Sequence, residues 1–174
     1  KDEPGSRISE AAMDLGQGWK VSPCIESNPQ EEVSLAEING PGLIQHMWFT
    51  VAAEFWRSLI LRMYWDDETY PSVLVPLGDF FCCGWNQACR VNSLPVAVNP
   101  NGGFNSFWEM PFDQNAHITI ENNGHKPVKY FFYQITYTLT DFPSDCGRFH
   151  ASWRRQNPLP KGEPYTILDK IQAQ

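Results

Sequence analysis

Residues 59–81 alternate between apolar and polar side chains on both sides of an acidic turn. In the first run four apolar residues share one face: Leu59, Leu61, Met63 and Trp65. This period of two is typical of a strand with one buried side. An acidic turn at residues 66–69 follows, Pro71 ends it, and residues 73–77 alternate again. The pattern predicts a β-hairpin with a solvated acidic turn.

Similar short apolar runs continue along the chain, separated by turns rich in proline, glycine and asparagine. The expected strands are residues 33–38, 43–51, 59–65, 72–77, 93–98, 104–110, 116–122, 128–140, 149–154 and 165–170. Residues 52–58 suit a single helical turn. About ten strands with little helix predict an all-β fold, an antiparallel β-sandwich of the jelly-roll type. A parallel sheet is excluded because it needs crossover helices.

The expected organisation is one domain behind a polar arm. Residues 1–31 are aperiodic and rich in glycine, serine, glutamine and glutamate, so we expect them to form an arm on the surface. Residues 32–174 are expected to form the jelly-roll β-sandwich domain, whose length suits a sizeable core.

Composition and charge exclude several classes of partner. Aromatic residues make up 14% of the chain, beside 14 prolines and 12 glycines, which favours short strands joined by turns. The net charge of −7 and the lack of clustered cations argue against a nucleic-acid partner. No apolar run reaches the roughly 18–20 residues of a membrane helix, so no membrane partner is expected.

The five cysteines include no C-x-x-C pair that would indicate a zinc knuckle. Cys82 and Cys83 are adjacent, and a disulfide between neighbours strains the backbone. Reduced cysteines in a cytoplasmic protein are the leading interpretation. A redox or nucleophilic role for this pair is an alternative, although no histidine lies nearby in sequence to activate it. The chain starts at Lys1 without an export signal, but one could have been removed, so an exported protein stays an alternative.

Neither a metal site nor a complete pair of catalytic carboxylates is predicted. The four histidines stand far apart without H-x-H or H-x-x-x-H spacing, so we expect no metal and no cofactor. Glycoside chemistry needs two carboxylates that flank the scissile bond. Asp79 and Glu109 are the better candidates because each lies among aromatic residues. The alternatives are that Asp79 caps the following turn and that Glu109 pairs with an arginine.

The remaining chemical signal is aromatic. Several rings lie beside asparagine, glutamate, arginine or histidine residues: Trp48, Trp85, Phe107, Trp108 and Trp153. Sugar sites combine flat ring faces with planar polar groups. The alternative is that most of these rings belong to the core.

Five segments carry a specific resemblance to a known family. They are residues 40–50 (GPGLIQHMWFT), 61–66 (LRMYWD), 76–81 (PLGDFF), 103–112 (GFNSFWEMPF) and 149–151 (FHA). In this order they resemble the bacterial family long labelled domain of unknown function 2961, which is now grouped with glycoside hydrolase family 172. The resemblance extends from about residue 14 to the last residue and covers nearly the whole chain.

The resemblance implies two jelly-roll domains in tandem that assemble as trimers or multiples of them. It also implies action on furanosides, with release or rearrangement of α-D-fructofuranosyl or D-arabinofuranosyl units with retention. The family's catalytic glutamates lie in a Gly-Glu-Gly-[Asp/Glu] motif and a Gly-Thr-Gly-x-Glu-Asp motif of the second jelly roll. This chain contains neither motif, so no residue here is expected to be catalytic.

The expected function is therefore the N-terminal jelly-roll half of a retaining furanosidase-like glycoside hydrolase, with the catalytic glutamates on a C-terminal half absent from this chain. The expected partners are a furanoside-containing oligosaccharide, that second half, and further copies in a homotrimer or a multiple of it. The alternative is a non-catalytic carbohydrate-binding or shell-forming jelly-roll module. Polar and aromatic residues alternate on the motif strands, and six of them are predicted to contact sugar or an interface: Trp48, Asn105, Phe107, Glu109, His150 and Arg154.

Overall fold

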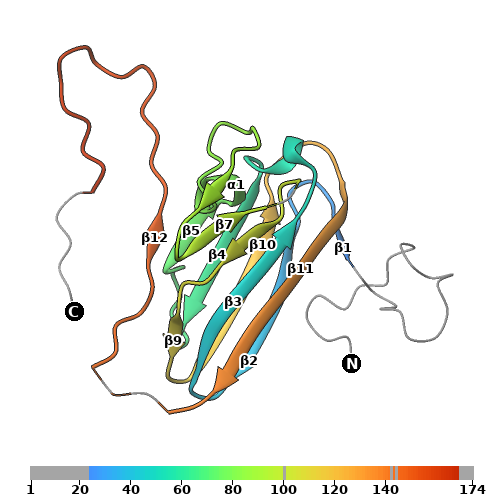
Figure 1. Cartoon of the computed structure of the whole chain (residues 1–174), viewed down its shortest axis with the longest axis vertical. Coiled ribbons are helices and arrows are strands. Elements are labelled where there is room, and N and C mark those ends of the chain that lie inside the picture. Colours follow the sequence, from blue (N-terminus) through green and yellow to red (C-terminus); the bar gives the residue numbers. More distant parts are fainter. Residues whose placement is uncertain (1–23, 100, 142, 144, 169–174) are drawn as a thin grey trace, which may run out of the picture.

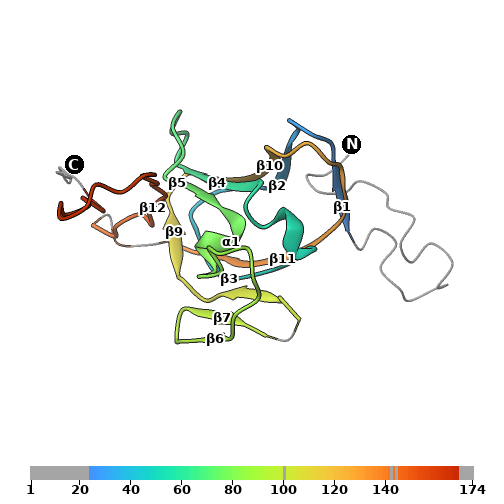
Figure 2. The same ribbon diagram turned by 90° about the horizontal axis from the view of Figure 1, so that it is seen from above.

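Two sheets of mainly antiparallel strands face each other across an apolar core (Figures 1 and 2). This computed structural model describes residues 24–99, 101–141, 143 and 145–168. The first sheet contains β1 (Ile25–Ser27), β3 (Gly42–Thr50), β6 (Val91–Asn92), β7 (Val96–Val98), β8 (Phe104–Ser106), β9 (Met110–Phe112) and β11 (Val128–Leu139). The second contains β2 (Glu32–Asn39), β4 (Leu59–Trp65), β5 (Val73–Pro76), β10 (Asn115–Asn122) and β12 (Ala151–Ser152). The helical elements are the short 3-10 turn η1 (Ala53–Phe55) and α1 (Leu77–Phe80).

The strand order is that of a jelly roll. Along the first sheet the order is β1-β11-β3-β8-β7-β6, and β9 also pairs with β3. Along the second sheet it is β12-β5-β4-β10-β2. Outside the β4–β5 hairpin and the run from β6 to β9, each step along the chain changes sheet. The order β1-β11-β3-β8 in the first sheet therefore matches the order β2-β10-β4-β5 in the second, as in a jelly roll. The predicted all-β jelly-roll sandwich is confirmed.

The core is built from the alternating faces that the sequence predicts. All four inward residues of β4 are buried: Leu59, Leu61, Met63 and Trp65. The predicted hairpin forms, with Leu61 of β4 opposite Val75 of β5. Phe104 of β8, in the first sheet, stacks on Phe81 with ring centroids 4.7 Å apart. Both rings are fully buried, which closes the core between the sheets.

Two predicted strands are shorter than expected. Residues 93–98 form a turn followed by β7, because Ser93 closes the turn with its side chain. The Ser93 hydroxyl donates to the carbonyl of Val96 at 2.8 Å and accepts the Val96 N–H at 3.1 Å. Residues 149–154 contribute only β12, which pairs in parallel with β5.

Residues 104–110 divide into β8 and β9 in place of one strand. The N–H of Phe107 donates to the carbonyl of Pro95, and residues 107–109 then turn outward to solvent. No strand forms over residues 165–168, and the rest of that predicted strand lies outside the described residues.

The acidic turn after β4 is not wholly solvated, so its interpretation is corrected at Asp66. The Oδ1 atom of Asp66 accepts the N–H groups of Asp113 and Gln114 at 2.7 Å each. Its Oδ2 accepts Nε of Arg148 at 2.6 Å. The next residue, Asp67, is exposed as predicted. Asp66 therefore ties the β4–β5 hairpin to the β9–β10 turn and to the segment that precedes β12.

Gly40 turns the chain between β2 and β3 with a φ of +94°, which residues with a Cβ atom rarely adopt. No atom lies within 4 Å of a Cβ built there, so Gly40→Ala is expected to cost backbone strain alone, about 1–2 kcal/mol of unfolding free energy. Gly147 is a matched control, because it has equal space and a φ outside the left-handed region. We expect Gly147→Ala to change the free energy of unfolding by less than about 0.5 kcal/mol when both variants are unfolded in urea. Equal urea midpoints for the two variants would contradict backbone strain at position 40.

Most of the predicted arm lies outside the described residues. Its later part contains β1, where buried Ile25 pairs with Phe131 of β11. The division into an arm of residues 1–31 and a domain of residues 32–174 stays a prediction. Within the described residues, no helix is long and apolar enough to cross a membrane.

Candidate functional site

Three of the six predicted site residues come together on the outer face of the first sheet. The register of β3 and β8 places Trp48 opposite Asn105. Oδ1 of Asn105 lies 3.2 Å from Nε2 of His46, whose ring stacks on Phe107 with centroids 4.8 Å apart. We call His46, Trp48, Asn105 and Phe107 the histidine cluster. It presents ring faces and an amide to solvent, and Phe107 is 48% exposed.

Glu109 and His150 lie on two segments that meet at one edge of the sandwich. The ring of Trp108 packs on Phe149 with centroids 5.5 Å apart. The indole N–H of Trp65 donates to the carbonyl of Phe149 at 2.8 Å, which fixes the second segment to the core. Figures 1 and 2 show β9 and β12 on this same side. Glu109 and His150 are both exposed, so the aromatic neighbours of Glu109 in sequence do not bury it.

Arg154 lines a separate pocket of about 550 Å³, which we call the arginine pocket. Its lining residues are Arg57, Asp79, Gly84, Trp85, Asn86, Trp153, Arg154 and Arg155. They come from the turn after η1, from α1 and the loop that follows it, and from the segment after β12. The pocket therefore joins three parts of the chain at the end of the second sheet.

A shared carboxylate holds the arginine pocket together. Nη1 of Arg57 donates to both carboxylate oxygens of Asp79, at 2.9 and 3.1 Å, and to the carbonyl of Gly84 at 2.5 Å. The indole N–H of Trp153 donates to Oδ1 of Asp79 at 2.9 Å. The Arg57 guanidinium also lies 5.1 Å from the centre of the Trp153 ring. Asp79 is thus the partner of Arg57 and Trp153, and it anchors the segment after β12.

The arginine pocket carries an excess of positive charge and exposed ring surface. Asp79 is the one acidic residue among its lining residues, against three arginines. Arg154 and Arg155 are exposed, and Trp85 is 92% exposed. Guanidinium groups donate several N–H bonds in a fixed plane, and indole faces stack on the apolar faces of rings. This combination suits a hydroxyl-rich or anionic ligand with a flat apolar face.

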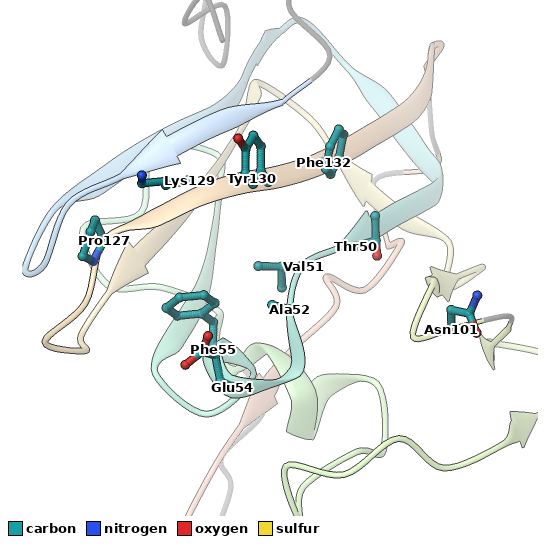
Figure 3. A pocket seen from close by; sticks show the side chains of 10 residues that line it. All are labelled: Thr50, Val51, Ala52, Glu54, Phe55, Asn101, Pro127, Lys129, Tyr130 and Phe132. Carbon is teal, nitrogen blue, oxygen red and sulfur yellow. The ribbon is translucent and has the colours of Figure 1, made fainter. Parts of the chain in front are cut away.

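A second concavity of about 540 Å³ lies between η1 and the first half of β11, and we call it the β11 groove (Figure 3). Its lining residues are Thr50, Val51, Ala52, Glu54, Phe55, Asn101, Pro127, Lys129, Tyr130 and Phe132. Figure 3 shows Tyr130 and Phe132 along β11, with Phe55 and Glu54 across from them on the η1 turn. None of the six predicted site residues lines this groove.

Several residues of these sites were missed by sequence reasoning. The aromatic neighbours of His46 in sequence leave both a structural and a site role open, and its place two positions before Trp48 on the same strand could have decided for the site. No sequence pattern pointed to Arg57 as a site residue, because its partners Asp79 and Gly84 are distant in the chain. Among the described residues, no group of three or more histidine, cysteine, aspartate or glutamate side chains could hold a metal ion.

Fold and surface together define a jelly-roll β-sandwich domain with aromatic, polar surface sites. The family described as GH172 domain-like matches residues 21–135, about two thirds of the chain. The chain therefore belongs to this family and is a domain related to glycoside hydrolases, which confirms the resemblance seen in the sequence motifs. A comparison with curated proteins gives no significant match. The matched region contains Arg57, Asp79 and the histidine cluster, and it ends before Trp153.

Proposed function

We propose that this chain is the sugar-contacting and assembly-forming jelly roll of a retaining furanosidase-type glycoside hydrolase. In this proposal the arginine pocket contacts a furanosyl oligosaccharide, and the catalytic glutamates lie on a second jelly roll. The observation that carries it is the pairing of Trp85 and Trp153 with three arginines in one pocket, within a domain of the GH172 family.

The acidic residues expected of a catalytic site are too few in the arginine pocket, which supports a binding role over a catalytic one. Glycoside cleavage needs two carboxyl groups on opposite sides of the scissile bond. Asp79 is the single acid that lines the arginine pocket, and it is engaged by Arg57 and Trp153. Glu109 is exposed on a different segment. In the part of the chain that the structure describes, the pocket thus offers donors and ring faces, but not the pair of acids that the chemistry requires.

The proposed partners are a second jelly roll and further copies of this chain in a trimer or a multiple of it. The far half of β11 offers a surface for such contacts, because Tyr137 and Leu139 are 46% and 58% exposed. Light scattering coupled to size-exclusion chromatography measures the assembly directly. A strictly monomeric chain at all concentrations would count against self-assembly of this domain alone.

The pocket predicts a specific loss of sugar affinity in Trp153→Ala. We expect the dissociation constant for fructo- or arabinofuranosyl oligosaccharides to rise about tenfold, or about 1.4 kcal/mol, because the variant loses the ring face and the indole N–H bond to Asp79 that positions the segment after β12. Isothermal titration measures this change. Tyr130→Ala is the matched control, since Tyr130 is a 54% exposed ring of the β11 groove. Loss of binding in the control with retention in Trp153→Ala would move the site to the β11 groove.

Two further measurements separate this proposal from a stand-alone carbohydrate-binding module. Aryl furanosides should give no turnover above background with this chain alone. Clear turnover would contradict the assignment of catalysis to a second jelly roll. Oligosaccharide affinity that stays unchanged when a second jelly roll is added favours the module, whereas affinity that the second jelly roll raises favours the proposal. The exposed Trp85 is the observation behind that alternative, because its ring is open to ligands in this chain by itself.

A further inference from the structure

Two cysteine sulfurs lie side by side at the two ends of a loop whose residues 84–86 line the arginine pocket. Sγ of Cys83 is 3.3 Å from Sγ of Cys89, and Cys89 also contacts the carbonyl of Cys82 at 3.4 Å. Cys83 is buried at 1% exposure, whereas Cys89 is exposed. The loop between them carries Trp85 and lines the arginine pocket.

We propose that Cys83 and Cys89 are a reversible dithiol–disulfide pair that closes the loop carrying Trp85 when an oxidant such as a low-molecular-weight disulfide is present. A sulfur–sulfur bond is about 2.05 Å long, so closure needs the two atoms to approach by little more than one ångström. Any consequence for sugar binding rests on the proposed function, but formation of the bond does not. The pairing differs from the adjacent Cys82 and Cys83 that the sequence draws attention to.

Accessibility sets the order of the two exchange steps. The thiolate of Cys89 attacks one sulfur of glutathione disulfide, which forms a mixed disulfide and releases one glutathione thiolate. Cys83 then loses its proton to solvent and attacks Sγ of Cys89, which releases the second glutathione. Two protein thiols are oxidised to one disulfide, and glutathione disulfide is reduced to two glutathione molecules. Cys83 acts second because burial keeps it from a bulky disulfide.

The second step is expected to be slow at neutral pH. Burial raises the pKa of Cys83 to about 11, and the neighbouring thiol of Cys89 adds to this effect. Cys83 is still buried when Cys89 carries glutathione, and only the thiolate attacks a disulfide, so the closure rate should rise with pH. The mixed disulfide at Cys89 should therefore accumulate first and then decay into the closed form.

A disulfide between Cys83 and Cys89 should restrain the loop that presents the Trp85 ring to solvent. In the open form the carbonyl of Gly84 accepts from Arg57, and the N–H of Asn86 donates to the carbonyl of Cys83. A covalent link across the same loop removes its remaining freedom to open. Oxidation should therefore slow amide hydrogen exchange over residues 84–88 by at least about tenfold.

Incubation of the full chain with glutathione disulfide, followed by intact mass and peptide mapping, tests the pair. We expect the wild type, Cys82→Ser and Cys146→Ser to yield a linked 83–89 peptide that has lost two hydrogens and that a thiol reductant reopens. Cys83→Ser should stop at glutathionylated Cys89, and Cys89→Ser should leave Cys83 unmodified. Wild-type protein that retains glutathione on Cys89 without ever linking would overturn the proposal, as would a Cys82–Cys89 link.

The loop and its ligand are tested separately in the same samples. Hydrogen exchange of residues 84–88 in the reduced and oxidised wild type reports the loop, and unchanged exchange would contradict its closure. Titration of the reduced and oxidised forms with furanosyl oligosaccharides measures the sugar affinity of the arginine pocket in each form. A linked loop with slowed exchange but no sugar binding in either form would uphold the dithiol pair and count against the proposed function alone.

Discussion

Trp65→Ala is expected to lower the free energy of unfolding by about 3–5 kcal/mol. Trp65 is 0% exposed at the end of β4, so truncation leaves a cavity that the rigid sheets cannot fill by relaxing. Its indole N–H also donates to the carbonyl of Phe149 at 2.8 Å, and this bond is lost with the ring. Urea unfolding followed by circular dichroism measures the change.

Trp85→Ala is the matched control for this variant. The same atoms are removed, but Trp85 is 92% exposed, and we expect a change within about 0.5 kcal/mol. Trp65→Phe helps to separate the two contributions, because it keeps most of the apolar volume and loses the whole bond to Phe149. Equal destabilisation by Trp65→Ala and Trp85→Ala would contradict the placement of Trp65 in the core.

The second large effect is expected at Asp66. Asp66→Ala removes acceptors for Asp113, Gln114 and Arg148, and hydrogen bonds to a charged group are worth about 1.5–3 kcal/mol. The three bonds share one carboxylate whose side chain is 18% exposed, so we expect a total loss of about 2–3 kcal/mol. Asp141→Ala is the control, since Asp141 is an exposed acid with little effect expected.

The contribution of Asp66 should also depend on pH. Burial alone would raise its pKa, but the N–H of Gln114, the side chain of Arg148 and the N–H of Asp113 outweigh it and lower the pKa below 3.8. The folded state therefore binds fewer protons than the unfolded state near this pH, and acid weakens folding. The stabilisation is complete above the ordinary pKa and disappears as the pH falls through the lowered value. Urea midpoints of wild type and Asp66→Ala should differ clearly at pH 7 and converge in strong acid, and a constant difference would contradict this linkage.

Local patterns predicted the strands well wherever one face of a strand is buried. The alternation of β4 places Leu61 and Met63 in the core, as the period of two requires. Prediction failed where a single side-chain or backbone hydrogen bond ends a strand early. Ser93 closes a turn on Val96, and the outward turn at residues 107–109 separates β8 from β9. These events depend on individual contacts rather than on apolar periodicity.

The candidate sites were predicted only in part, and the missing residues share a cause. The sequence pointed to Trp48 and Asn105, which lie on paired strands, and it named Asp79, Trp85 and Trp153 singly, but it did not bring these three together with Arg57 and Arg154 in one pocket. Arg57 meets Asp79 across 22 positions of sequence, and Trp153 meets Asp79 across 74. Such contacts depend on how the chain crosses between the sheets, which no local pattern encodes.

By itself, the amino-acid sequence determined the all-β class, the β4–β5 hairpin and membership of the family, because these depend on periodicity and on motif order. Tertiary structure alone decided the roles of the charged and sulfur-containing side chains. It converted part of the acidic turn into a half-buried tether through Arg148, which lies 82 positions from Asp66. It also brought Cys83 beside Cys89, although the sequence emphasised Cys82 and Cys83. In each case the deciding quantity is a distance between side chains, which exists only after the two sheets have closed on their core.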